Sequence, residues 1–249
     1  MPDKLGSAYS IGLTSLRARQ LDMETATDNL ANLNTPGFKE RRVSFQTYLG
    51  NEDGELVRAG VRATETTPNL MQGPTQTTFQ TWDLAIDGEG YFALQLPSGE
   101  VGYSRLGRFH LDSDRRLTTE QGYLLTPPVT IPEGAEYVSI DAQGIITTVQ
   151  NGLPQVVGNL ELTRFANPEG LQHIGDGIQR PTAASGAPIT AAPAENGLGQ
   201  VLGGALEMSN VDAASQMINI MNVQKAYGLA LRALQITDQM TEINNQLQG

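Results

Sequence analysis

The residues that could carry chemistry in this 249-residue chain are few and poorly grouped. The sequence holds two histidines, His110 and His173, and no cysteine, which excludes disulfides, thiolate metal sites and cysteine nucleophiles. A metal cage built from several histidines is therefore not expected. His110 alternates with the apolar residues Phe109 and Leu111 in a stretch that predicts a strand, which favours a surface histidine over a catalytic one.

Two sequence patterns resemble known ligand-binding loops, but each lacks a required part. Asp112–Asp114 resembles the opening of a calcium loop, yet Arg116 and Tyr123 stand at the fifth and twelfth positions, where oxygen ligands are needed. We interpret it as a polar hairpin tip. The glycines of Gly197–Gly204 resemble a phosphate-binding loop, but no strand is predicted before them and no Gly-Lys-Ser/Thr end follows.

The evidence for catalytic carboxylates is equally weak. Asp83, Asp87 and Glu89 lie close together, but they adjoin Trp82 and turn glycines and read as strand-end and turn residues. No serine stands in a Gly-x-Ser-x-Gly elbow. The sequence therefore predicts a protein that is not an enzyme and that carries no cofactor and no metal.

Charge is unevenly distributed along the chain. The net charge is −11, and residues 46–206 account for most of it, with eight Lys/Arg against eighteen Asp/Glu. Non-specific nucleic-acid binding needs a basic surface, so no nucleic-acid partner is expected. The two ends are near neutral and would not repel one another if many copies were packed side by side.

Targeting signals are weak. No stretch reaches eighteen apolar residues, so no membrane insertion is expected. Residues 1–13 have neither a signal-peptide core nor a small-residue cleavage site, which predicts a cytoplasmic protein or one exported without cleavage of a signal.

Proline placement predicts two helical ends around a non-helical middle, because proline breaks helix interiors and the interior prolines all lie between Pro36 and Pro193. The first helix is expected from about Ser7 to Asn32, and Pro36-Gly37 would end it. Its apolar residues recur at intervals of seven, at Tyr9, Leu16, Met23 and Leu30.

A second helix is predicted from about Asp212 to Leu247, with Asn210 or Asp212 as its cap. An alanine row at 226, 230 and 233 would let another helix approach closely. Its apolar seam reads Met217, Ile220, Tyr227, Leu231, Leu234, and then Ile236, Met240, Ile243, Leu247.

The middle of the chain predicts β structure. Short runs rich in apolar residues alternate with turn signals such as Asp87-Gly88 and Asn151-Gly152. The expected strands are Tyr91–Leu96, Val138–Ile140, Ile145–Val149 and Val156–Phe165, and Thr182–Gly199 is expected to be an extended connector. The fold class is thus α+β: long terminal helices forming a coiled-coil-like layer, with a central, mainly antiparallel β domain. We expect three segments, at 1–45, 46–206 and 207–249.

The two apolar stripes leave two hypotheses open. Burying one large apolar side chain is worth about 1.5–3 kcal/mol, so a five-residue seam is worth about 10 kcal/mol and needs a partner. In one hypothesis the helices pack on the chain's own β domain. In the other, many copies form a polymer held by coiled termini.

Sequence motifs at both ends resemble those of the bacterial flagellar rod and hook proteins. Thr27–Asn32 with Asn34–Lys39 is similar to the family's N-terminal motif, and Ser209–Asp212 with Val223–Tyr227 is similar to its C-terminal motif. Within the β region, Asp83–Phe92 resembles the family's first strand region.

Further segments bear on the branch of the family. Phe165–Leu171 and Ala184–Pro188 resemble the distal-rod branch more than the proximal one. Only Gln46–Arg62, with a turn expected at Asn51–Gly54, stands where the distal branch usually has a longer insertion. The proximal-rod assignment therefore stays open, and so does a soluble β-domain binding module.

The resemblance implies a structural subunit that polymerises helically with its own copies into a hollow drive shaft. It implies assembly with other rod proteins and the hook, surrounding P and L rings in a Gram-negative cell, and a periplasmic basal body reached through the flagellar export apparatus.

The apolar rows of the two helices and the family motifs together predict which residues lie at the subunit interface. Asn29, Asn32 and Asn34 have two interpretations, local cap and turn chemistry or hydrogen bonds between subunits. The N-terminal set is Leu16, Met23, Asn29, Leu30, Asn32 and Phe38. The C-terminal set is Asn210, Met217, Ile220, Tyr227, Leu231 and Leu234.

Overall fold

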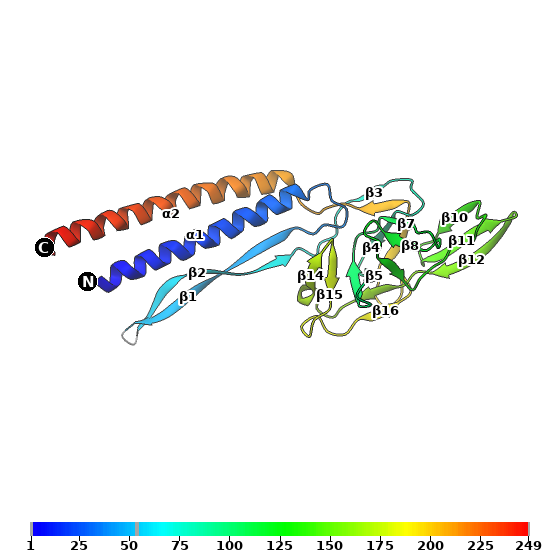
Figure 1. The fold of residues 1–249 in the computed structure, drawn as a ribbon, viewed down its shortest axis with the longest axis horizontal. Coiled ribbons are helices and arrows are strands. Elements are labelled where there is room, and N and C mark those ends of the chain that lie inside the picture. The colour runs from blue at the N-terminus through cyan, green and yellow to red at the C-terminus, as the bar shows by residue number, and fades with distance from the viewer. Residues whose placement is uncertain (1, 53–54, 249) are drawn as a thin grey trace. The chain divides into compact units, whose positions relative to one another are not determined.

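The computed structural model describes residues 2–52 and 55–248, which fall into two compact units (Figure 1). Unit 1 consists of residues 1–33, 40–69 and 211–249, and unit 2 of residues 34–39 and 70–210. The terminal helices and the β-rich middle confirm the predicted α+β class. The predicted segment boundary at residue 45 falls within a strand of unit 1.

Two long helices dominate unit 1. Helix α1 spans Pro2–Ala31 and helix α2 spans Ala213–Gln248, close to the predicted ranges. Asp212 caps α2, since its carboxylate accepts a hydrogen bond from the Ser215 amide at 2.9 Å. The chain leaves α1 through a turn in which Gly37 has a φ of +69°, a backbone conformation that glycine adopts easily.

The helices pack against each other through small residues on α1. Ala18 and Ala26 are buried on α1, and Val223 and Leu234 are buried on α2. Gly12 allows the closest approach, because a Cβ atom at that position would lie 2.5 Å from Leu234 Cδ2. The predicted coiled-coil-like pairing of the two ends is therefore present within one chain.

A long hairpin completes unit 1. Strand β1 (Arg41–Glu52) pairs antiparallel with β2 (Glu55–Pro68), and α1 packs against both strands. No strand was predicted here, although Val43, Phe45 and Leu49 fall on alternate positions and form a partial period-two signal. Of the predicted turn, Asp53 and Gly54 lie outside the described residues.

Unit 2 is built from short antiparallel strands arranged in several sheets. The largest has the order β14-β15-β6-β5-β9-β8-β7, and β13 pairs with both β5 and β16 beside it. Strands β10, β11 and β12 form a separate three-stranded sheet, while β4 pairs with β17 and β3 with β18. The bounds are β3 Thr75–Thr77, β4 Leu84–Asp87, β5 Tyr91–Gln95, β6 Val101–Ser104, β7 Phe109–Leu111, β8 Leu117–Thr119, β9 Leu124–Thr126, β10 Tyr137–Ile140, β11 Ile145–Gln150, β12 Leu153–Asn159, β13 Leu162–Arg164, β14 Gln172–Gly175, β15 Ile178–Arg180, β16 Ile189–Ala191, β17 Gln200–Gly203 and β18 Ala205–Glu207.

The core of unit 2 explains most of the strand predictions. Leu84, Phe92 and Ile146 are fully buried within one continuous apolar cluster. The predicted strand Val156–Phe165 is divided in the structure, because β12 ends at Asn159 and β13 begins at Leu162. The predicted connector Thr182–Gly199 contains strand β16, which pairs with β13.

Candidate functional site

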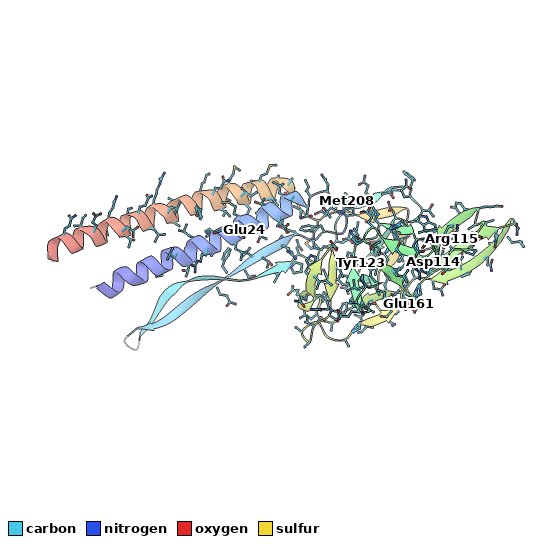
Figure 2. All side chains as sticks on the ribbon, viewed as in Figure 1. Glu24, Asp114, Arg115, Tyr123, Glu161 and Met208 are labelled. Carbon is cyan, nitrogen blue, oxygen red and sulfur yellow. The ribbon has the colours of Figure 1, made fainter. Side chains whose placement is uncertain are left out.

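A metal site finds no support in the part of the chain that the structure describes. Among those residues, no group of three or more His, Cys, Asp or Glu side chains could hold a metal ion. Asp114 and Arg115, labelled in Figure 2, lie in the turn between β7 and β8, which confirms the predicted hairpin tip. His110 is exposed on β7, as predicted. No described helix is long and apolar enough to cross a membrane.

Helix α2 carries a second apolar face besides the one that packs on α1. The buried residues Gln216, Val223 and Leu234 mark the inner face, and Leu234 packs over Gly12 of α1. A row of apolar residues spaced by seven lies roughly 140° around the helix from that face. It consists of Leu229, Ile236 and Ile243, which are 65%, 53% and 57% exposed, and we call it the outer row of α2.

The predicted C-terminal interface residues do not all lie on one side of α2. Leu234 is buried on the inner face, Ile220 and Tyr227 are half-buried, and Met217 and Leu231 are exposed. The predicted seam therefore combines residues already packed inside the chain with residues open to a partner. Asn210 precedes the helix and donates a hydrogen bond to the Met71 carbonyl at 2.7 Å within unit 2.

Most of the predicted N-terminal interface residues are half-buried. This group contains Leu16, Met23, Leu30, Asn32 and Phe38. The Asn32 side chain donates to the Asp28 carbonyl one turn earlier at 2.9 Å, which is the local helix-end chemistry of the first interpretation.

Asn29 differs from these residues because it is buried. Its Nδ2 donates to the Arg41 carbonyl and its Oδ1 accepts from the Arg41 amide, each at 2.8 Å. The amide thus ties α1 to the first residue of β1 as a neighbouring strand would. The sequence alone did not predict that Asn29 connects α1 to β1 within the chain, in addition to any role at the helix end.

A polar chain extends from Asn29 across unit 1. Asn29 Nδ2 lies 3.4 Å from Gln216 Oε1, and Gln216 Nε2 donates to Glu40 Oε1 at 2.9 Å. Arg42 and Asn69 donate to Glu40 Oε2, each at 2.9 Å. The network joins α1, the beginning of β1, the end of β2 and the first turn of α2. It therefore fixes the directions in which the two helices and the hairpin leave this junction.

An open cleft of about 390 Å³ adjoins this network. Its walls come from α1, the start of β1 and the first turns of α2, with Asp22, Thr25, Arg42, Phe45 and Asn219 among the lining residues. Among the described residues, no cluster of His, Cys, Asp or Glu that could hold a metal ion lines this cleft.

Unit 2 has a buried ionic cluster of its own around Glu207, on β18. The Glu207 carboxylate accepts a hydrogen bond from Lys39 Nζ, lies 3.3 Å from Arg105 Nη1 and accepts from the Gly73 amide at 3.0 Å. The Gly37 amide donates to the Glu207 carbonyl at 2.7 Å. Glu207 therefore holds the segment 34–39 to the rest of unit 2.

The electrostatics of this cluster reflect its burial. Burial lowers the pKa of Lys39 below its ordinary value of 10.5, and the neighbouring Glu207 carboxylate opposes that shift. Glu207 was not predicted as a site residue, and its one signal in the sequence is a carboxylate within the otherwise uncharged run from Val201 to Val211.

Comparison with known protein families shows which families the chain is similar to. Three family models match, described as "Flagella basal body rod protein" over residues 11–39, "Flagellar hook protein FlgE/F/G D1 domain" over 85–148 and "Flagellar basal body rod FlgEFG protein C-terminal" over 202–247. The matches cover both terminal helices and much of the β region, in the order expected from the sequence motifs.

Full-length relatives agree. The chain is 37% identical to the flagellar basal-body rod protein FlgG of Caulobacter vibrioides, over 97% of this chain and 99% of the relative. It is 31% identical to FlgG of Bacillus subtilis, over 96% and 97%. FlgF of Caulobacter vibrioides is more distant, at 28% identity over 95% and 96%.

Proposed function

The chain belongs to the FlgG family of flagellar basal-body rod proteins, and we propose that its copies polymerise helically through the outer row of α2. As a member of that family it is a structural, non-enzymatic subunit of the rod. The single observation that carries the proposal is a helix of 36 residues whose inner face is packed against α1 while its outer row stays exposed.

The physical argument is the free energy of burying the outer row. Covering Leu229, Ile236 and Ile243 is worth about 1.5–3 kcal/mol for each side chain that becomes fully buried. Lys225 and Arg232 lie near this row, and their long apolar stems can lie along a neighbouring helix while the charges reach water. The contact repeats in every subunit, so a moderate gain per contact is enough to hold a filament.

Location and partners are proposed from the family. Identity to FlgG above that to FlgF supports the distal rod, where the filament would transmit torque from motor to hook. We infer assembly with the other rod proteins and the hook, passage through P and L rings where a cell has them, and delivery to the periplasm by the flagellar export apparatus without cleavage of a signal.

The test is a charge placed on the exposed side of α2. Leu229→Asp and Ile236→Asp would each force a carboxylate of the outer row into an apolar contact between subunits, at a cost of several kcal/mol. We expect both variants to remain monomeric by sedimentation and electron microscopy, while unit 2 keeps its thermal melting transition. The conservative variant Ile236→Leu is the control and should still assemble. Rods of normal length from both aspartate variants would overturn the proposal.

A second measurement follows the helices through assembly. The helix pairing inside one chain relies largely on small residues of α1, so residues 1–35 and 208–249 should be less helical in the dilute monomer than in the rod. Circular dichroism of both forms measures this difference. Equal helicity in the two forms would show that assembly does not order the termini.

A further inference from the structure

The sheet formed by β10, β11 and β12 has one uncharged face turned to solvent. Cross-strand partners lie on the same face of an antiparallel sheet, and the register places two rows of three on it. The rows are Tyr137–Val149–Pro154 and Ser139–Thr147–Val156, and we call these six residues the neutral face.

The opposite face of the same sheet is fixed to the core of unit 2. Ile146 is fully buried there, and Val138, Ile140 and Val157 pack against the same apolar cluster. The sheet is therefore anchored on one side only. On the neutral face, Tyr137 is 65% exposed and Val156 is 61% exposed.

The absence of charge on this face is unusual for so acidic a chain. Strands β10, β11 and β12 contain no Asp, Glu, Lys or Arg, although the chain has a net charge of −11. Glu136 and Asp141 stand immediately before and after β10, at the rim of the sheet. A face that combines an aromatic ring, three apolar residues and no charge favours a contact with protein over contact with water.

We propose that the neutral face is a docking surface for unit 2 of a second copy of this chain. The proposal rests on the proposed self-assembly and specifies a contact in addition to the outer row of α2. A basic partner would be recognised best by carboxylates, which the middle of this face lacks. An equally acidic copy, in contrast, can approach closely only where like charges are absent.

The contact involves the face of the sheet and not its edge. Strand β12 lies at the edge of the three-stranded sheet, and Pro154 within it has no backbone N–H to offer to an added strand. Tyr137 and Val156 instead stand at opposite ends of the neutral face, so a neighbouring copy can pack across all three strands.

A single cysteine provides the test, because the chain has none of its own. Val156→Cys is labelled with a benzophenone maleimide, assembled into rods and irradiated, and the crosslinked peptides are identified by mass spectrometry. Ser98→Cys, in the exposed turn after β5, gives the background. We expect crosslinks between two copies of this chain at several times the background. Crosslinks to a different protein, or none above background, would overturn the inference.

A charge variant separates this inference from the proposed function. Val156→Asp should raise the concentration needed for assembly at least tenfold, while Gln143→Asp, in the turn of the same sheet, should leave it unchanged. The thermal melt of each monomer checks that unit 2 stays folded. If Leu229→Asp blocks assembly and Val156→Asp does not, the neutral face is refuted and the helical contact stands. If Leu229→Asp and Ile236→Asp both assemble, the proposed function itself fails.

Discussion

Asn29 forms hydrogen bonds with both backbone groups of Arg41, donating to its carbonyl and accepting from its amide at 2.8 Å each. The pair joins the last turns of α1 to the first residue of β1. Because both polar ends of the Asn29 amide are used within the chain, this residue stabilises unit 1 before any neighbour arrives.

Replacing Asn29 tests that role. Asn29→Ala should lower the free energy of unfolding of unit 1 by about 2–3 kcal/mol, since two hydrogen bonds are lost and the Arg41 backbone groups are left without these partners. Hydrogen exchange at the Arg41 amide should accelerate in parallel. Asn34→Ala, at an exposed position, is the control and should change neither quantity. An unchanged exchange rate in Asn29→Ala would contradict the assignment.

Gly12 and Leu234 provide a test of the helix pairing. Gly12→Leu should weaken the packing of α1 on α2 by about 1–3 kcal/mol, because even its Cβ would collide with the Leu234 side chain. Adding Leu234→Ala should recover part of that loss by making room. A double-mutant cycle in urea denaturation measures the coupling, and strictly additive effects would mean that the two residues do not meet.

Glu207 is expected to be the most sensitive residue of unit 2. Glu207→Gln would leave Lys39 and Arg105 buried without their counter-charge, at a cost of about 3–5 kcal/mol in the melting of unit 2. The double variant Glu207→Gln with Lys39→Met should recover stability, since it also removes one of the unpaired charges. Glu89→Gln is the exposed control. A Glu207→Gln protein that melts like the wild type would refute the importance of this cluster.

Glu40 should make unit 1 sensitive to acid. Burial alone would raise the pKa of Glu40, but hydrogen bonds from Asn69, Arg42 and Gln216 outweigh it and hold the pKa below the ordinary 4.5. The charged form is thus stabilised by folding, and this contribution is present above pH 4.5 and lost as the pH falls through the lowered pKa.

The corresponding measurement is urea denaturation of unit 1 at a series of pH values from neutral to acidic. The stability of the wild type should decline below its plateau as Glu40 becomes protonated. In Glu40→Gln the decline should be shallower, because the substituted side chain does not titrate. Identical pH profiles for the two proteins would exclude Glu40 as a source of the acid sensitivity.

Carboxylate labelling can locate the outer surface of the rod. Glu133 and Glu136 of unit 2 and Glu24 and Glu242 of the helices are all exposed in the single chain, and Glu24 is labelled on α1 in Figure 2. If the helices form the inner layer, carbodiimide labelling of intact rods should modify Glu133 and Glu136 well before the helical carboxylates. The free monomer is the control, with all four reacting. The reverse order in rods would place the helices outside.

The sequence by itself determined the terminal helices, the β-rich middle and the absence of an enzyme-like motif. These are local signals: proline excludes helix between Pro36 and Pro193, heptad spacing indicates helix at the ends, and residue types limit chemistry. The motifs around Asn29 and Asn210 also indicated the rod and hook family, which the full-length relatives confirm. The β1–β2 hairpin had a local signal as well, in the alternation from Val43 to Leu49.

Only the tertiary structure decided which side of each element faces a partner. The heptad spacing of α2 could not separate Leu234, packed against α1, from Leu231 and Ile236, which stay exposed. Spacing shows which residues share a side of the helix, but it does not show which side the neighbouring helix covers. The Lys39–Glu207 pair spans 168 residues of sequence, and no local pattern encodes such a contact. Buried polar contacts of this kind depend on the geometry that brings their elements together, so they could be found only in the folded chain.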